Sequence, residues 1–201
     1  DCTINKDVVV KSFVQLFQNA GDLSAAQWVK TGVTITTDAT TDPDGGTTTA
    51  DEMKEDGSTG DHRIIQTTAA SVNNGVKYRQ DWWIKLKSGT RNIMLSFDTA
   101  NFPANAHCFF DIVNGEIEEQ GAGLDDASIT QWANGWYLCR IEATADSLVG
   151  SVGTIFPHME ASKAFEDFGM RHTVFTNTDS PKKGHGNIYE PLTDDAKETL
   201  Q

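Results

Sequence analysis

Apolar and polar side chains alternate with a period of two through much of the chain, which is the pattern of a β-strand with one buried face. The segment YRQDWWIKLK, residues 78–87, is the clearest run of this kind. Its alternation places one set of side chains toward the core, namely Tyr78, Trp82, Ile84 and Leu86. The opposite face is expected to carry Arg79, Asp81, Trp83, Lys85 and Lys87.

The segment QWANGWYLCRIEATAD, residues 131–146, predicts a hairpin turn followed by a second such strand. Asn134 and Gly135 favour a type I′ turn, because both residues tolerate the positive φ that this turn requires. Trp132 and Trp136 are then expected to lie near each other across a strand pair. Beyond the turn, one face is expected to carry Tyr137, Cys139, Ile141 and Ala143, and the other Trp136, Leu138, Arg140, Glu142 and Thr144.

Short runs rich in β-branched and aromatic residues recur from about residue 12 to residue 159. They include VTITT at 33–37, RIIQTT at 63–68 and NIMLSF at 92–97, and turns rich in Gly, Asn and Asp separate them. No amphipathic helix of useful length intervenes. The pattern therefore predicts an all-β antiparallel sandwich and excludes a doubly wound α/β fold.

The two ends of the chain are less regular. Val10, Phe13, Val14 and Phe17 fit a helical repeat, yet residues 12–17 also alternate, and we favour a strand after residue 12. Past residue 159, the pattern favours a short helix at 160–170, a strand at 173–176, a loop at 180–186 and a last strand at 187–189, with 193–201 as a brief helix or an arm to a neighbouring subunit. We divide the chain into a sandwich at 1–159, with an N-terminal arm at 1–11, and a C-terminal extension at 160–201 that includes a closing strand at 187–189.

The length and the net charge of the chain exclude several classes of function. A length of 201 residues suits one sandwich with a sizeable core. The formal net charge of −13 argues against binding nucleic acid or an anionic membrane surface, since both need clustered Lys and Arg. The longest apolar runs are far too short to cross a bilayer, so we expect a soluble chain without membrane insertion.

The inventory of reactive residues predicts a protein without catalytic activity. Cys108 and Cys139 lie in strand-like runs and are expected to be buried thiols, and no C-x-x-C spacing suggests zinc. No nucleophile elbow, phosphate-binding loop or dinucleotide fingerprint occurs. An acid/base pair for glycoside hydrolysis could in principle be drawn from five carboxylates, but nothing except their abundance supports it. They are Glu116, Glu118, Glu119, Asp125 and Asp126. The histidines are scattered without metal-ligand spacing, at His62, His107, His158, His172 and His185.

Several segments, taken in order, resemble one family. They are Trp28, TGVTITTDATTDPDGGTTTADEMKED from residue 31, HRIIQTT from 62, GVKYRQDWWIKLKSG from 75, CFFDIVNGEIE from 108 and NGWYLCRIEATA from 134. This order is similar to that of the carbohydrate-binding-module-like jelly-roll domains of phage head fibres, tail fibres and related virion proteins. The likeness spans residues 16–145, with a weaker echo at 187–189. Relatives commonly end in an aromatic-rich strand, of which only Ile188 and Tyr189 remain here.

The resemblance implies a jelly roll and a non-catalytic structural role on a virion surface, as a capsid decoration, head fibre or tail fibre component. It also implies contact with other virion proteins or with further copies of this chain as a homo-oligomer, and attachment to surface glycans. A basic loop at Lys182, Lys183 and His185 is compatible with docking on an acidic neighbour. The alternative is a glycan-binding module of a secreted, extracellular polysaccharide-active protein.

Two tryptophans are the candidates for contact with a glycan or partner. Trp83 lies among charged neighbours on the polar face of its strand, where an indole could stack on a sugar ring while Arg79 and Asp81 bind its hydroxyls. Packing of Trp83 under a loop is the alternative. Trp132 precedes a tight turn, which places it at a rim, and cross-strand packing with Trp136 is the alternative. Trp136 and Trp28 are expected to be structural.

Carboxylates around the turn DPDGG suggest one metal site. Asp42, Asp44 and Asp51 flank this glycine-rich turn and could supply oxygen ligands to calcium together with backbone carbonyls. A solvated turn is the alternative, because Asp-Pro-Asp-Gly is also an ordinary turn sequence. No other cofactor is expected.

Overall fold

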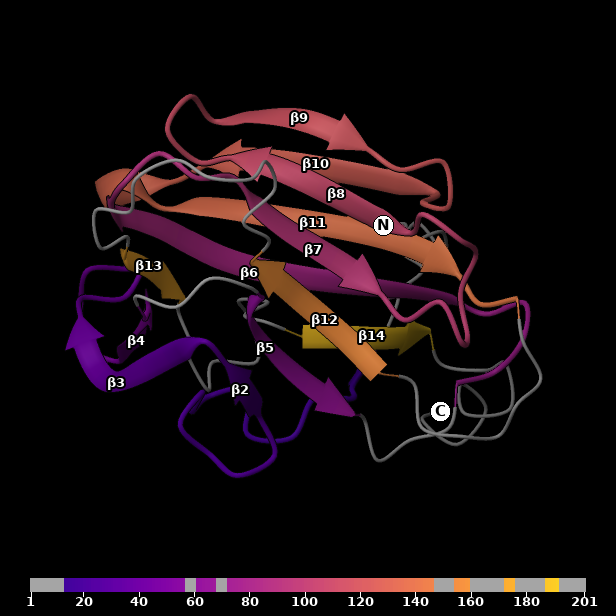
Figure 1. The fold of residues 1–201 in the computed structure, drawn as a ribbon, viewed down its shortest axis with the longest axis horizontal. Helices are drawn as coiled ribbons and strands as arrows, with labels where there is room; N and C mark the ends of the chain where they lie inside the picture. The colour runs from indigo at the N-terminus through magenta and orange to yellow at the C-terminus, as the bar shows by residue number, and fades with distance from the viewer. Residues whose placement is uncertain are drawn as a thin grey trace, which may run out of the picture.

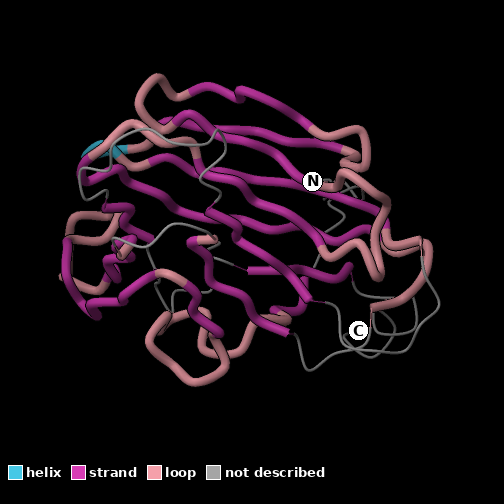
Figure 2. Tube along the Cα trace, in the orientation of Figure 1, coloured by secondary structure: helices cyan, strands magenta, loops and turns pink. Residues whose placement is uncertain are grey.

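The computed structural model describes residues 13–56, 61–67, 72–146, 154–159, 172–175 and 187–191. These residues form two antiparallel β-sheets packed face to face (Figure 1). Apart from one 3₁₀ turn at Ala133–Gly135, the described part consists of strands and loops (Figure 2). The prediction of an all-β sandwich is confirmed, and the finer assignment to the jelly-roll class stays a prediction. No helix among the described residues is long and apolar enough to span a membrane.

The first sheet is built around one long strand, β6 (Lys77–Ser88). On one side β6 pairs with β11 (Tyr137–Thr144), which pairs with β10 (Asp126–Gln131). The other side of β6 is shared, because β13 (His172–Phe175) pairs with its C-terminal half and β14 (Asn187–Pro191) with its N-terminal half. Beyond these two lie β4 (Ala50–Glu55) with β3 (Val33–Thr40), and β1 (Phe13–Gln15).

The second sheet has the order β2, β5, β12, β7, β8, β9. Its strands are β2 (Val29–Thr31), β5 (His62–Thr67), β12 (Thr154–Met159), β7 (Ile93–Phe97), β8 (His107–Asp111) and β9 (Glu116–Gln120). Strand β12 joins two halves of this sheet, since it pairs with β5 on one side and β7 on the other.

The core lies between the sheets and follows the alternation of the strands. Tyr78, Trp82 and Ile84 of β6 are each no more than 1% exposed, as the period of two predicts. The largest rings form a cluster, in which Trp28 lies 5.0 Å from Phe17 and 5.8 Å from Trp82 between ring centroids. The second pair is edge-to-face, and such aromatic pairs stabilise a core by about 0.5–1.5 kcal/mol beyond the burial of their area. Trp28 is therefore structural, as predicted.

Both described cysteines are free, buried thiols, which confirms the expectation for Cys108 and Cys139. Burial, with a smaller contribution from the nearby Glu119 carboxylate, raises the pKa of Cys108 to about 12. Burial also raises the pKa of Cys139 well above its usual value, with a smaller contribution from Cys108. Because the thiolate is the reactive form, neither side chain is suited to nucleophilic or redox chemistry.

The turn after β10 has the predicted geometry. Asn134 has φ 58° and ψ 27°, Gly135 has φ 77°, and the Trp136 N–H donates to the Ala133 oxygen at 3.2 Å. These are the features of a type I′ turn. Outside it, the Trp132 N–H donates to the Trp136 oxygen at 2.7 Å, so the two residues lie side by side as predicted.

The structure describes parts of both ends of the chain. A strand at residues 13–15 confirms the choice of strand over helix there, and the last strand is present at 187–191. Strands β13 and β14, which both follow residue 159, lie within the first sheet beside β6. The division at residue 159 stays a prediction, and the closing strand that it includes at 187–189 pairs with β6. The predicted arm at 1–11, helix at 160–170, loop at 180–186 and terminal segment at 193–201 lie outside the described residues.

Candidate ligand-binding surface

A second, smaller apolar cluster covers part of the outer face of the first sheet, on the side away from the core. It consists of the buried residues Ala50, Trp83 and Trp136, with Leu138 packed against them. Leu138 of β11 lies opposite Trp83 of β6 in the strand register, so both side chains point to the same side. We call these four residues, together with Trp132, the tryptophan cluster.

Trp132 is the exposed member of the tryptophan cluster. Its side chain is 44% exposed, and its ring centroid lies 5.0 Å from that of Trp83 at an interplanar angle of 68°. Trp83 is only 3% exposed. The edge-to-face contact holds the Trp132 ring against a buried partner, so part of its rotational freedom is already lost before anything binds.

Lys85 lies beside the tryptophan cluster and contacts one of its members, Trp136. The Trp136 ring is fully buried, and the Lys85 ammonium lies 5.9 Å from its centroid, within range of a cation–π interaction. Nε1 of Trp136 is buried and has no hydrogen-bond acceptor among the described residues. An indole N–H is a donor only, so this group is suited to a water or ligand oxygen.

The turn between β3 and β4 closes the cluster from a third direction. A Cβ placed on Gly45 would lie 3.4 Å from Nδ2 of Asn134, so this turn comes close to the hairpin that carries Trp132. Ala50, the first residue of β4, contributes directly to the apolar cluster. Three segments that lie far apart in the sequence thus meet at one corner of the sandwich.

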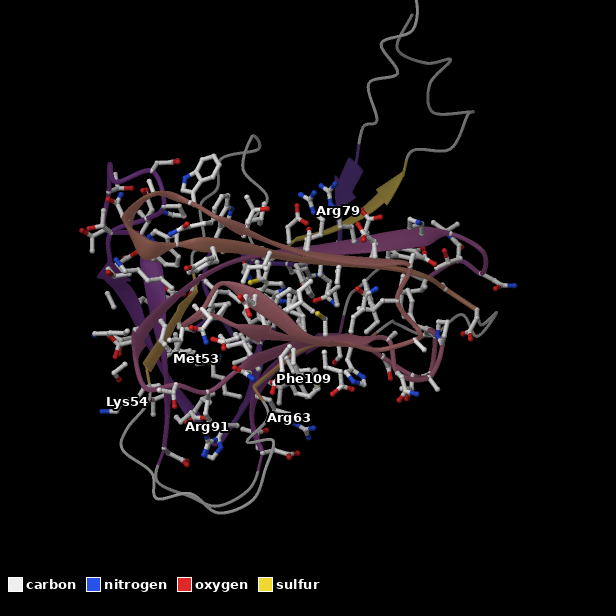
Figure 3. The ribbon with its side chains drawn as sticks, turned by 90° about the horizontal axis from the view of Figure 1, so that it is seen from above. Met53, Lys54, Arg63, Arg79, Arg91 and Phe109 are labelled. Carbon is white, nitrogen blue, oxygen red and sulfur yellow. The ribbon has the colours of Figure 1, made fainter. Side chains whose placement is uncertain are left out.

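A row of charged side chains lies next to the tryptophan cluster on the same face. Asp81 is 2% exposed and accepts hydrogen bonds from Nε and Nη2 of Arg140 at 2.7 and 2.9 Å. Nε of Arg79 lies 3.2 Å from the same carboxylate. Viewed along the sheets, Arg79 stands on the outer side of the layer that contains β6 and β11 (Figure 3).

The four predicted contact residues therefore have different roles. Trp132 alone presents a large exposed ring, as its position before the turn predicts. Trp83 is on the expected outer face but is not an exposed platform, because Trp132 and Leu138 cover it. Asp81 is enclosed in an ion pair rather than open to a ligand, and Arg79 is half-buried beside it. Strand alternation cannot show this, because the covering groups come from another hairpin.

Sequence reasoning did not select Lys85, Ala50 or Leu138. The alternation of β6 does place Lys85 on the same face as Trp83, which was the available signal. For Leu138 the signal was its position on the outer face of β11, where an apolar residue is unusual. Ala50 carries no signal of its own, since its role depends on the pairing of distant strands.

Two of the three carboxylates proposed as calcium ligands, Asp42 and Asp51, accept hydrogen bonds from protein groups. Asp42 shapes its own turn by accepting hydrogen bonds from the Thr47 hydroxyl at 2.6 Å and from the Gly46 N–H at 3.4 Å. Burial alone would raise the pKa of Asp42, but these bonds and those from the Gly45 and Asp44 N–H groups lower it. The turn therefore holds an ionised carboxylate with protein donors.

Asp51 fixes two other backbone segments. Its carboxylate accepts hydrogen bonds from the Leu23 N–H at 2.8 Å and from the Asp38 N–H at 3.1 Å. Burial raises the pKa of Asp51, against the effect of these two bonds. In the described part of the chain, no group of three or more His, Cys, Asp or Glu side chains is placed to hold a metal ion. The structure thus does not assemble the calcium site from Asp42, Asp44 and Asp51.

An open groove of about 310 Å³ lies on the second sheet, and no motif in the sequence indicated it. Polar side chains from β5, from β7, from the loop between β7 and β8 and from β8 line it, namely Arg63, Ser96, Asp98, Thr99, Asn105 and His107. Arg63 already has a carboxylate partner, since its Nη1 lies 3.3 Å from Oδ2 of Asp61. The acidic residues considered for glycoside hydrolysis, Glu116, Glu118, Glu119, Asp125 and Asp126, are all exposed on β9, on β10 and before β10.

Fold and surface define an all-β antiparallel sandwich with an aromatic corner on its outer face. No protein-family model matches the chain, and a search of curated proteins finds no significant match. Among solved structures, the crystal structure of the enzymatically active domain of bacteriophage CBA120 tailspike protein 4 superposes with a TM-score of 0.40 and 14% identity. The match covers 88% of this chain and 20% of that one, so the chain spans about a fifth of the tailspike chain. Similarity at this level assigns neither a family nor an activity.

Proposed function

We propose that this chain is a non-catalytic structural protein of a phage virion that attaches to surface glycans through the tryptophan cluster. The observation that carries the glycan part is the exposed ring of Trp132, held edge-on against the buried Trp83. The virion part rests on the resemblance of five sequence segments to phage fibre domains. Two of these segments, around residues 42–50 and 134–138, come together at the tryptophan cluster.

The chemistry of the tryptophan cluster suits a sugar. A pyranose ring presents an apolar C–H face that can stack on an indole, while its hydroxyls need polar partners at the rim. The rim supplies the Asn134 side-chain amide and the Lys85 ammonium. Because Trp132 is already held by Trp83, stacking costs little additional side-chain entropy.

We expect Trp132→Ala to weaken glycan binding by at least about tenfold, because it removes the stacking surface. A glycan array with the intact chain would identify a ligand, and calorimetry would then measure its affinity for the variant. The matched control is Val113→Ala, which removes another exposed apolar side chain, 48% exposed, from a different turn. Equal affinity of the Trp132 variant and the intact chain would contradict the proposed contact surface.

The virion role predicts that the chain associates with particles. Antibodies against the chain should label purified phage particles, and light scattering after size-exclusion chromatography should show an oligomer. A strict monomer at high concentration, with no label on particles, would contradict the virion assignment. If such a monomer still bound glycans through Trp132, it would instead fit a module of a secreted polysaccharide-active protein.

A further inference from the structure

We infer that the tryptophan cluster favours glycans that carry carboxylate groups, such as uronate-containing polysaccharides, and that Lys85 is the residue that recognises the charge. This inference rests on the proposed glycan-binding function and specifies the class of its ligand. It starts from the position of one cation beside the exposed aromatic ring.

Lys85 differs from most basic side chains of the described part in its surroundings. Lys77, Arg91 and Arg140, among others, each have a carboxylate oxygen within 4 Å. Lys85 has no such partner among the described residues, and its ammonium lies over the face of Trp136. A Cβ on Gly135 would lie 3.7 Å from Cε of Lys85, so the lysine stem follows the hairpin that carries Trp132.

The spacing between this cation and the aromatic platform fits one sugar ring. Lys85 and Trp83 are two residues apart on the same face of β6, which corresponds to about 7 Å along a strand. The Trp132 ring rests on Trp83. A pyranose stacked on Trp132 would therefore bring an attached carboxylate within reach of the Lys85 ammonium, where a charge-assisted hydrogen bond can form.

Local charge favours an acidic ligand here, although the whole chain repels it. The outward positions of β6 and β11 carry five basic residues, Lys77, Arg79, Lys85, Lys87 and Arg140, and two acidic ones, Asp81 and Glu142, so these positions have a net charge of 5 − 2 = +3. The chain as a whole has −13. At physiological salt, charges more than about 8 Å away are largely screened, so the Lys85 ammonium itself, which has no carboxylate partner among the described residues, decides how the cluster meets a charged ligand.

The test compares sugars that differ only in charge. Oligosaccharides of galacturonate, glucuronate and mannuronate would each be paired with the carboxyl-reduced, neutral form of the same length, on one array that also holds common neutral glycans. Calorimetry of the pairs that bind would include the intact chain, Lys85→Met and Lys85→Arg. Lys54→Met is the matched control, because Lys54 lies on β4 outside the tryptophan cluster.

We expect the intact chain to bind at least one acidic oligosaccharide about fivefold more tightly than its neutral form at low salt. Lys85→Met should remove this preference, Lys85→Arg should keep it, and Lys54→Met should leave it unchanged. Added salt should lower the affinity for the acidic oligosaccharide more than the affinity for the neutral one. Equal affinity for both forms, with binding still lost in Trp132→Ala, would overturn the inference while the proposed function stands. If the chain bound no glycan on the array, both the inference and the proposed glycan-binding function would be contradicted.

Discussion

Replacing Asp81 with alanine is expected to lower the free energy of unfolding by about 2–3 kcal/mol. The carboxylate is buried and receives two hydrogen bonds from Arg140 and a close contact from Arg79. Without it, two guanidinium groups would face each other beside the tryptophan cluster with no common counter-charge. Both arginines keep part of their surface in water, and for this reason the loss should stay below that of a fully enclosed ion pair.

Urea unfolding followed by tryptophan fluorescence would measure this loss. Asp126→Ala is the control, because Asp126 is an exposed carboxylate of the same sheet, on β10, opposite Glu142 of β11. Its removal should change stability by less than about 0.5 kcal/mol. A loss at Asp81 as small as that of the control would mean that the ion pair with the two arginines contributes nothing to the fold.

The second large effect is expected for Gly121→Ala, at the end of β9. A Cβ at this position would overlap the backbone oxygen of Asn105 and would lie 3.0 Å from the His107 oxygen. Both obstacles are backbone atoms, which cannot rotate away as a flexible side chain could. The Gly121 N–H also donates to the His107 oxygen at 2.8 Å, so the two segments cannot separate without breaking this bond. We expect a destabilisation of about 3 kcal/mol.

Gly46→Ala provides the comparison for the same substitution. No atom lies within 4 Å of a Cβ on Gly46, and the residue is exposed. The change in its free energy of unfolding should be within about 0.5 kcal/mol. Thermal unfolding of the two variants side by side separates close backbone packing from a general effect of losing a glycine. Similar melting temperatures for both would show that the β8–β9 region can shift to admit a methyl group.

The local sequence pattern was sufficient to predict much of the fold. The alternation in β6 and β11 identified which residues face the core, since a strand must direct successive side chains to opposite faces. Asn134-Gly135 identified its turn, because few residue pairs tolerate positive φ at both central positions. Such features depend on a few neighbouring residues, and a sequence reports them directly.

Features that depend on distant pairing were harder to anticipate. Nothing local indicates that β13 would lie between β4 and β6, or that β14 would pair with the other half of β6. The same limit explains the candidate surface. Trp83 has the polar neighbours of an exposed residue in the sequence, but a hairpin about fifty residues later covers it. The role of Asp51 is a related case, since its carboxylate binds the backbone of two other segments, which the sequence around it does not indicate.

The tryptophan cluster has members on β4, on β6 and on the hairpin between β10 and β11, and no pair of these segments is adjacent in the chain. Non-local strand pairings of this kind form slowly during folding, because the entropy of closing long loops must be overcome first. An isolated hairpin or a proteolytic fragment would therefore lack the surface even if it kept Trp132. Ligand affinity thus reports whether the whole first sheet has assembled, and a bound glycan would in turn protect that assembly against denaturation.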